Sequence, residues 1–600
     1  MKNSKTILST PEDFEEAIQL AANQPLVCVD TEYHKSNKWG EARIIGVFWG
    51  YPVGSEFHSF YAPFRHGEFP TTKNLDPSLI LEFNRLTGAQ IYHNFQADRQ
   101  VFLHDNVVLD RRFIWDTMVM SHIVNENEFS YSLDALSLKY FKARKVSLTS
   151  LEKDAGLEWH HIPPVIMGDY ACTDVYLTYR HYVRCRASLQ QQKLENLYYD
   201  YEQFIKVLAR VIERGLVIDV QLALKLQEEG RTELSRIEKS LGFKPSSPQL
   251  VAKLLHTTLG LPVLYKTTKG APSTASVHLR RYSDRYPEIK PYIQDILNYR
   301  STYKAVSTWY EGFLTKRGVD GLLHPGLTIV SGSKSGKDDE KGGTRTGRLS
   351  CREPNLQQVP RATSSSSSVR KLFKDPDGYR LVELDLSQAE LRLIGWYMNK
   401  QGDSTFYDAF CNNADLHAIT AERMNLTQGL PFKEARQVGK TCNFSLGYRA
   451  GPGQLQHILY RDGGLDVDLK QATVWHSAWH NAYPKIYEMN VMAQETAAKQ
   501  GFVRMWNGRR RRLVGNESFK AFNSIIQGGV GQVLTKTMIE VDKQFPHLQV
   551  VNQVHDSLWI YIKEGEVDSV VPSVLQLMEQ VPTEQFGMPF KVDWKYWHND

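Results

Sequence analysis

The sequence predicts a multidomain protein that combines an α/β part with an α+β part, and three stretches of the chain support this. Residues 1 to about 195 alternate strands and helices, with apolar runs at 26–29 and 44–49. From about 200 to 340 the sequence is helical and amphipathic, which is typical of an arm. Beyond 370, two strand-like segments, 381–392 and 550–562, bracket a mainly helical block from about 403 to 500. We therefore expect a mixed sheet, then a helical arm, then a strand-based domain with a helical insertion.

Length and composition limit the class of protein. The 600 residues are enough for several domains, and the net charge of +5 is mildly basic. Acidic metal ligands would subtract from a larger basic surface, so this charge is compatible with a polyanion partner. No segment is long and apolar enough to cross a membrane, and the N-terminus lacks the apolar core of a signal peptide. We expect a cytoplasmic protein that is neither secreted nor bound to a membrane.

Two local patterns lead to simple expectations. The N-terminus predicts a strand followed by a helix that Thr10 caps, with Pro11 in its first turn. The six cysteines are scattered without CxxC spacing, so we expect buried thiols rather than disulfides or zinc ligands.

Acidic residues near the N-terminus form the first candidate site. VCVDTE places Asp30 and Glu32 on one face of a strand end, because strand side chains repeat with period two. HNFQAD and DYACTD add Asp98, Tyr170 and Asp174, which we expect on helices. Four clustered carboxylates can hold two hard cations that act on a phosphodiester, and Tyr170 can hold the attacking water. The sequence therefore predicts a metal-dependent nuclease centre.

Two aspartates farther along the chain form the second candidate site. Asp385 ends the apolar run of LVELDLSQAELR, and Asp556 follows the apolar residues of VVNQVHDSLWIYI. A carboxylate at the end of a buried strand is costly unless it is compensated, and two divalent cations would compensate both aspartates if these meet in space. Taken singly, each aspartate is more typical of a residue that opens a helix or turn.

A helix between these aspartates carries cations and rings at every fourth position. In ARQVGKTCNFSLGYR these residues are Arg436, Lys440, Phe444 and Tyr448. They lie near one helical stripe, which suits the phosphates, sugar and base of a nucleoside triphosphate. The bare pattern is also typical of an amphipathic surface helix. The GKT at 439–441 is no P-loop, because Glu434 stands where a P-loop has glycine.

The order of the motifs resembles that of family A DNA polymerases over essentially the whole chain. The matching segments are TGRLSCREPNLQQVP, DLSQAELR, DLHAITAE, the helix of Arg436, NSIIQG and QVHD. The DTE, NxxxD and YxxxD motifs resemble those of DEDDy exonucleases, and Asp116 with SLDAL is similar to the proofreading domain of bacterial DNA polymerase I. The organisation, without a 5′ nuclease domain, is similar to that of phage replicative polymerases.

The resemblance implies an RNase H-like exonuclease domain followed by a right-hand polymerase domain. The implied boundaries are 1–195 for the exonuclease, 196–345 for the thumb, 346–402 and 501–600 for the palm, and 403–500 for the fingers. The implied activity is DNA-templated addition of dNTPs to a primer 3′ end by two-metal nucleotidyl transfer, with 3′→5′ proofreading, in phage-like replication. The alternatives are a repair or gap-filling polymerase, a DEDD exonuclease with a noncatalytic DNA clamp, and a noncatalytic nucleic-acid-binding protein.

The resemblance also implies the ligands of the metal ions. Two Mg²⁺ ions are expected at each site, and Mn²⁺ can substitute. At the polymerase site the implied ligands are Asp385, the backbone carbonyl of Leu386, and Asp556. At the exonuclease site they are Asp30, Glu32, Asp98 and Asp174.

Other residues are implied to bind the substrates, which are primer–template DNA and dNTPs, in a monomeric enzyme. Glu390 would exclude ribonucleotides, although it equally suits a helix start, and His417 would join the phosphate contacts, although a lone histidine is more often packed. The nucleotide-binding set is Arg436, catalytic Lys440, Phe444, Tyr448, His417, Glu390 and Gln388. The DNA-binding set is Arg348, Asn523, Gln527 and His555.

The chain also departs from the family pattern. Ser557 stands where the family usually has glutamate, and Arg449 stands where it has glycine. Phe444, where some relatives have tyrosine, resembles the form that rejects dideoxynucleotides. Residues 509–512 (RRRR) predict a solvated basic turn or, alternatively, a phosphate contact. Residues 331–343 predict a flexible loop, with a partner-binding role as the alternative.

Overall fold

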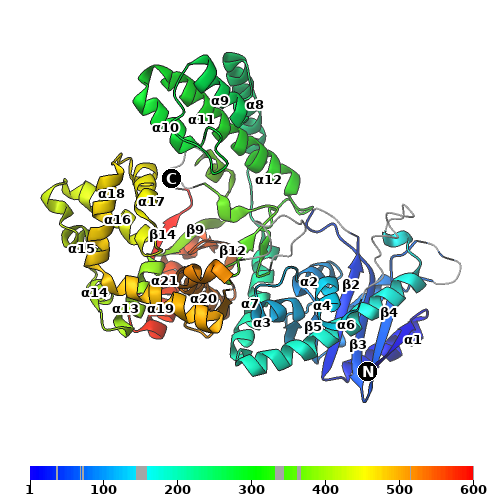
Figure 1. Cartoon of the computed structure of the whole chain (residues 1–600). Coiled ribbons are helices and arrows are strands. Elements are labelled where there is room, and N and C mark those ends of the chain that lie inside the picture. The colour runs from blue at the N-terminus through cyan, green and yellow to red at the C-terminus, as the bar shows by residue number, and fades with distance from the viewer. Residues whose placement is uncertain are drawn as a thin grey trace.

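The computed structural model describes residues 1–34, 38–67, 69, 73–143, 159–330, 344–360, 367–513 and 515–598. The predicted loop at 331–343 lies outside these ranges. Figure 1 shows an N-terminal α/β domain, a helical arm in green, and a C-terminal part that runs from yellow to red. None of the helices in the described ranges has the length and apolar composition that a bilayer span requires.

A mixed six-stranded sheet forms the centre of the N-terminal domain, as predicted. In spatial order the strands are β1 (Lys2–Ile7), β4 (Glu56–Pro63), β3 (Ile44–Val53), β2 (Leu26–Tyr33), β5 (Ala89–Tyr92) and β6 (Ile114–Asp116). Strand β3 is antiparallel to both of its neighbours, β4 and β2. The other neighbouring pairs, β1/β4, β2/β5 and β5/β6, are parallel. Strand β3 is buried over most of its length because helices cover both faces.

Helices of this domain begin at capping residues that the sequence supplies. Thr10 accepts a hydrogen bond from the Asp13 N–H at 3.1 Å, which confirms the predicted cap of the first helix. Asp116 caps another by accepting from Met118 and Val119. The helices are α1 (Pro11–Ala22), α2 (Phe95–His104), α3 (Thr117–Val124), α4 (Leu133–Phe141) and α6 (Pro164–Gln192), with short turns at Pro77–Arg85 and Trp159–His161.

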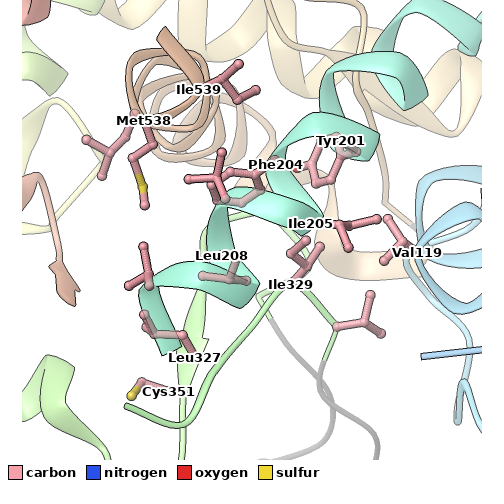
Figure 2. Close-up of a cluster of buried hydrophobic side chains, with 14 of the residues drawn as sticks. Val119, Tyr201, Phe204, Ile205, Leu208, Leu327, Ile329, Cys351, Met538 and Ile539 are labelled. Atoms are coloured by element: carbon pink, nitrogen blue, oxygen red, sulfur yellow. The ribbon is translucent and has the colours of Figure 1, made fainter. Parts of the chain in front are cut away.

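Helix α7 (Glu195–Arg214) joins the N-terminal domain to the C-terminal sheet domain. Its apolar residues recur at helical spacing and are buried on more than one side, so it is an internal strut. Figure 2 shows Phe204, Ile205 and Leu208 packed between Val119 of α3 and Met538 of α20. The predicted thumb, 196–345, therefore starts with a helix that belongs to the base of the molecule rather than to the arm.

The arm is built from two long helices and a small tip. The tip has a hydrophobic core of its own, separate from the main core, formed by Val251, Leu255, Leu279, Tyr282, Ile289, Ile293 and Ile296. Two π-helical turns, Leu254–Thr258 and Ala305–Tyr310, interrupt its helices. The α-helices are α8 (Val220–Leu241), α9 (Pro248–Lys253), α10 (Ser276–Arg285), α11 (Lys290–Lys304) and α12 (Glu311–Lys316), with a 3₁₀ turn at Pro287–Ile289.

A four-stranded antiparallel sheet lies within the ranges expected for the palm, and we use that name for it. Its strands, in spatial order, are β12 (Gln549–Val554), β13 (Ser557–Lys563), β9 (Tyr379–Leu386) and β14 (Val592–Tyr596). The segment predicted as one strand-like run at 550–562 is a hairpin of two strands, with His555 and Asp556 in its turn. Helix α21 (Val567–Phe586) packs against this sheet, α20 (Ala521–Gln544) packs against α21, and α13 (Ala389–Lys400) packs against α20.

The segment 403–500, which we call the fingers after the expectation above, is helical, as the sequence predicts. Their helices are α14 (Thr405–Cys411), α15 (Leu416–Arg423), α16 (Phe432–Leu446), α17 (Pro452–Gly463), α18 (Leu469–Ala482) and α19 (Pro484–Gln500). Two small hairpins complete the described part, β7 (Leu327–Thr328) with β8 (Ser350–Cys351) and β10 (Phe502–Arg504) with β11 (Arg510–Arg512). Short helical turns lie at Leu356–Gln358, Ser367–Leu372, Leu426–Gln428, Gly515–Lys520 and Glu564–Glu566.

Candidate active sites

The end of strand β2 brings the N-terminal acids together. Asp30 and Glu32 lie on β2, Asp98 lies on α2, and Asp174 lies on α6, which confirms the expected elements. The Thr31 N–H and hydroxyl both donate to Asp98 Oδ1, at 3.0 and 2.8 Å, and so fix that carboxylate against the strand. Tyr170 is partly buried on α6, one helical turn before Asp174.

Burial and mutual repulsion dominate the electrostatics of this cluster. Burial raises the pKa of Asp30 well above its usual value, and the charges of Asp98 and Asp174 raise it further. Burial also raises the pKa of Asp98 to about 7, although hydrogen bonds from Thr31 oppose the shift. The nearby charges of Asp98, Glu32 and Asp30 add to burial in raising the pKa of Tyr33. The cluster is therefore stable only with bound protons or with cations.

The donor set of the cluster suits hard divalent cations. Its ligands are carboxylate oxygens, which Mg²⁺ and Mn²⁺ prefer. Within the described ranges, no three His, Cys, Asp or Glu side chains stand close enough together to hold one ion as they are placed. The Thr31 N–H lies between two of the carboxylates and donates to both Asp30 Oδ1 and Asp98 Oδ1, at 2.9 and 3.0 Å. Cation binding would therefore require these carboxyl groups to lose their protons and to adjust their side-chain positions.

Asp116 has a structural role beside this site. Its carboxylate accepts hydrogen bonds from the backbone N–H groups of Asn94 and Phe95, at 3.2 and 2.9 Å, as well as from the first turn of α3. It thereby ties the start of α2, which carries Asp98, to the end of β6. The sequence singled out Asp116 only through a family resemblance, and the structure supplies the physical reason.

The palm sheet brings Asp385 and Asp556 to one edge. Asp385 is the next-to-last residue of β9, and Asp556 lies in the β12–β13 turn. The Leu386 N–H donates to the Asp556 carbonyl at 3.0 Å, so the two segments adjoin directly. Burial raises the pKa of Asp556 to about 6, and the charges of Glu390 and Asp385 add to this effect against that of Arg348. Two carboxylates and a backbone carbonyl at one sheet edge suit a pair of divalent cations.

Two residues flanking these aspartates have left-handed backbone conformations. His555 has φ 52° in the hairpin turn, and Gln388 has φ 54° before α13. Non-glycine residues rarely adopt this region, and such strain clusters at functional sites. His555 is exposed, as an expected DNA contact should be. Gln388 Oε1 and, on α20, Asn523 Oδ1 are buried acceptors for which no donor occurs among the described residues.

Glu390 lies between the fingers and the palm in a clamp of two hydrogen bonds. The Tyr448 hydroxyl donates to one carboxylate oxygen at 2.5 Å, and Arg348 donates to the other at 2.6 Å. Arg348 also donates to the backbone carbonyl of Gln527 at 3.0 Å. Burial, and then the charge of Glu390, raise the pKa of Tyr448. The clamp connects four residues that the sequence assigned to nucleotide or DNA binding.

Some of the predicted DNA contacts line one cavity. It has a volume of about 220 Å³, and its walls include Arg348 and His555 together with Gln357 and Gln553, which the sequence had not singled out. Gln357 donates to Gln553 Oε1 at 2.9 Å. Amide and guanidinium groups of this kind can contact the acceptors of a DNA minor groove.

Helix α16 carries three of the four residues of the predicted stripe, whereas Tyr448 lies beyond its end at Leu446 and is partly buried. Lys440 and Phe444 are exposed, while Arg436 is half-buried and pairs with Asp415 at 2.6 Å. Asp415 also caps α15, where it accepts from the His417 N–H at 3.0 Å. Sequence reasoning did not assign a site role to Asp415, although its position before LHAIT is a recognisable capping signal.

His417 lies beneath this stripe rather than on it. It is only 4% exposed, and its ring lies 5.7 Å from the ring of Phe444. Burial lowers the pKa of His417 to about 4, and the charge of Arg436 acts in the same direction. Asn443 donates to its Nδ1 at 3.2 Å, so the ring is neutral and carries its hydrogen on Nε2. His417 can therefore offer a hydrogen bond to a phosphate but no positive charge.

Arg449 adopts the backbone conformation that glycine favours. Its φ is 63°, and its guanidinium donates to Gln494 Oε1 on α19. The residue that departs from the family pattern therefore keeps the left-handed geometry at the end of the fingers helix, at the strain that a Cβ adds there.

Residues 509–512 correct the predicted solvated basic turn. Arg509 and Arg511 are buried, because β11 and the residue before it pack against the N-terminal domain. Arg509 donates to the Tyr201 hydroxyl at 2.8 Å, and Arg511 and Arg512 pair with Glu126 at 3.3 and 2.5 Å. The arginines therefore hold two domains together, and their buried guanidinium groups are not available to a phosphate.

Five of the six cysteines are buried free thiols, as predicted, but Cys411 is exposed. It is the last residue of the short helix α14, where the sequence pattern does not indicate which side faces solvent.

The comparisons with known proteins place the chain in a family. The model of DNA polymerase family A matches residues 220–599, and that of a 3′–5′ exonuclease matches residues 6–190. The chain belongs to DNA polymerase family A and carries a 3′–5′ exonuclease domain before the polymerase domain.

Individual relatives agree with this assignment. The DNA polymerase I of Pseudomonas aeruginosa is 26% identical over 93% of this chain and 62% of its own length. The DNA polymerase DpoZ of Salmonella phage PMBT28 is 24% identical over 84% of this chain and 86% of its own length. The chain thus spans about half to three fifths of the bacterial relatives but most of the phage protein. A solved structure, the polymerase domain of Pol1 from M. smegmatis with DNA primer–template and dNTP, covers 99% of this chain with a TM-score of 0.80 at 19% identity, which supports the fold.

Proposed function

We propose that the protein is a DNA-directed DNA polymerase that adds dNTPs to a primer 3′ end and proofreads with a 3′→5′ exonuclease. The observation that carries the proposal is the junction of Asp385, Asp556 and Glu390 with Tyr448 at the end of the fingers helix. This junction brings a carboxylate pair and a triphosphate-binding stripe to one place, which nucleotidyl transfer requires. The phage relative, matched over most of its length, supports a role in replication.

At the polymerase site, Asp385, the Leu386 carbonyl and Asp556 would hold two divalent ions, Mg²⁺ or Mn²⁺. Bound there, the ions supply activation of the primer hydroxyl and neutralise phosphate charge. Arg436 and Lys440 bind the phosphates electrostatically, and the His417 Nε2–H offers a further hydrogen bond.

The nucleotide's base and sugar are held by the other half of the stripe. Phe444 and Tyr448 offer their rings to the base and sugar, while Gln388 lies at the start of α13 beside the same site. Glu390 fills the space near the sugar's 2′ position, and the clamp of Tyr448 and Arg348 holds it rigidly there.

At the exonuclease site, two divalent ions would bind the four carboxylates and Tyr170 would position a water molecule. The ligands are Asp30, Glu32, Asp98 and Asp174, and the raised pKa values of Asp30 and Asp98 favour exchange of a proton for a cation. Arg348, Asn523, Gln527 and His555 would contact the primer–template. We further propose a monomer that works in the cytoplasm, or in the host's if a phage encodes it. The proposed domain boundaries are those given above, except that α7 belongs to the base of the molecule and the thumb begins after it.

Primer extension and single-strand digestion by paired variants test the proposal. Asp385→Ala or Asp556→Ala should abolish extension with Mg²⁺ and four dNTPs and leave digestion intact. Asp30→Ala combined with Glu32→Ala should abolish digestion and spare extension. Loss of both activities in either folded variant would refute the division into two sites. Digestion without any extension by the parent would favour an exonuclease with a DNA clamp, and neither activity would favour a noncatalytic binder.

A further inference from the structure

The tip of the arm contacts the fingers directly. The Tyr460 hydroxyl, on α17, donates to the Asp284 carboxylate on α10. Beside this bond, the Arg281 guanidinium lies over the Tyr460 ring, 4.7 Å from the ring centroid. The same guanidinium forms an ion pair with Asp466 Oδ1 at 3.6 Å. The ring of His278 lies 6.1 Å from that of His457 in the same contact. These pairs connect segments more than 170 residues apart in the chain.

This contact is made by side chains. Among the described residues, no backbone hydrogen bond joins α10 to α17 or to the segment that follows it. The Arg281 side chain is nevertheless only 14% exposed, so the contact removes a charged group from water. Burial, followed by the adjacent Asp284, raises the pKa of Tyr460, and the hydroxyl therefore keeps its proton as the donor. A contact of this kind can open without unfolding either helix.

The two contacting segments belong to separately packed bodies. The arm tip has its own hydrophobic core, and Tyr282 of that core lies on the same helix as Arg281 and Asp284. Helix α17 packs on α16, which carries Arg436 and Lys440. The base of the arm and the base of the fingers both join the palm, so palm, arm and fingers form a closed circuit of contacts. In Figure 1, α10 lies at the side of the arm that faces α17 of the fingers.

We propose that Arg281, Asp284, Tyr460 and Asp466 form a latch that closes the arm against the fingers and so encircles DNA bound on the palm. The latch rests on the proposed function, since it needs duplex DNA bound on the palm. A closed circuit prevents sideways escape of the duplex, while the product can still slide along its axis. The latch therefore increases the number of nucleotides added in one encounter with the primer and leaves the chemical step unchanged.

Extension in a single encounter tests the latch. The enzyme is bound to primed template, and reaction starts with dNTPs, Mg²⁺ and excess trap DNA. We expect Arg281→Ala and Tyr460→Phe to shorten the products about two- to five-fold, the factor that partly exposed polar pairs supply. Arg285→Ala is the matched control, because it removes the same charge from the same helix, and Arg285 lies over the Tyr286 ring of the arm itself. Equal product lengths in all four proteins would overturn the proposal.

Multiple-encounter extension separates this outcome from failure of the proposed function. With enzyme in excess and no trap, the latch variants should extend primers at the parental rate. A parent that extends no primer under any condition contradicts the polymerase assignment itself, whereas normal extension with unchanged single-encounter lengths contradicts only the latch.

Cross-linking tests encirclement independently of rate. Asp284→Cys and Tyr460→Cys are combined with Cys411→Ser, because Cys411 is the exposed native thiol and the other five are buried. A short bis-maleimide is added after the protein has bound a primed circular single strand. We expect the cross-linked complex to survive high salt on the circle and to dissociate once the DNA is cut. Salt-induced release from circle and linear DNA alike would contradict an encircling latch.

Discussion

Ser557 lies directly opposite Asp385 in the antiparallel ladder between β13 and β9. Its side chain is buried, and its hydroxyl donates back to the Val554 carbonyl at 2.9 Å. The hydroxyl therefore braces the turn that carries Asp556. A glutamate, usual in the family at this position, could not make this bond to a carbonyl.

Ser557→Ala should preserve polymerase activity and weaken the turn. Loss of the hydrogen bond to Val554 is expected to lower the free energy of unfolding by about 1 kcal/mol. Urea unfolding measures this change, and primer extension at saturating Mg²⁺ measures activity. A loss of extension in a stably folded Ser557→Ala protein would show that the hydroxyl itself serves the metal site.

Asp98 makes stability depend on pH and on divalent ions. Its folded pKa of about 7 lies above the unfolded value of ~3.9, so the folded protein binds an extra proton between these pH values. The stabilisation from this group is complete below pH ~4 and is lost as the pH rises through 7.

Asp98→Asn should remove this pH dependence. The amide oxygen can still accept the bonds from Thr31, so without divalent ions the variant should be more stable at pH 8 by on the order of 1 kcal/mol or more. The variant should also lose most of the Mn²⁺-dependent rise in Tm. Thermal unfolding without Mn²⁺ measures the change in stability, and unfolding with Mn²⁺ measures the loss of this rise. An unchanged Mn²⁺ effect would exclude Asp98 as a ligand.

The clamp on Glu390 predicts a specificity change. Glu390→Ala should raise ribonucleotide incorporation relative to deoxynucleotide incorporation by about 10-fold or more, because a steric barrier at the sugar is removed. The ratio of kcat/KM for a dNTP and its matching rNTP measures this. If Glu390 only starts α13, stability falls and the ratio stays the same. Tyr448→Phe, which leaves Glu390 in place, should give a smaller change in the same direction.

The domain interface depends on a buried ion pair. Glu126→Ala should lower the free energy of unfolding by about 3 kcal/mol, because it leaves Arg511 and Arg512 without their buried carboxylate partner. Glu15→Ala, which breaks the exposed pair with Arg85, is the control and should cost less than about 1 kcal/mol. Equal effects in denaturant unfolding would show that the interface is solvated.

Arg449→Gly should be close to neutral for stability. Glycine relieves the left-handed strain at φ 63° but loses the contact with Gln494 and costs backbone entropy, terms of about 1 kcal/mol that oppose each other. Arg449→Ala keeps the strain and loses the contact, so it should be the less stable of the two in urea unfolding.

Local patterns were sufficient to predict much of this protein. Period-two and period-four spacing predicted the strand of Asp30, the helices of Asp98 and Asp174, and the positions of Arg436, Lys440 and Phe444 on α16. The capping pattern at Thr10 predicted the start of α1. These features depend on neighbours within a turn or a strand. The order of motifs predicted the family.

Only tertiary structure decided what depends on contacts between distant segments. Asp556 lies in a hairpin turn because β12 and β13 pair with each other, whereas the sequence left open whether it ends a strand or opens a turn. The buried state of Arg511 depends on Glu126, nearly 400 residues away in sequence. The neutral state of His417 likewise depends on the packing of α15 against α16. A sequence pattern records which side chains are polar, but burial and the partner across a domain boundary determine whether each one is a ligand, a brace or a link.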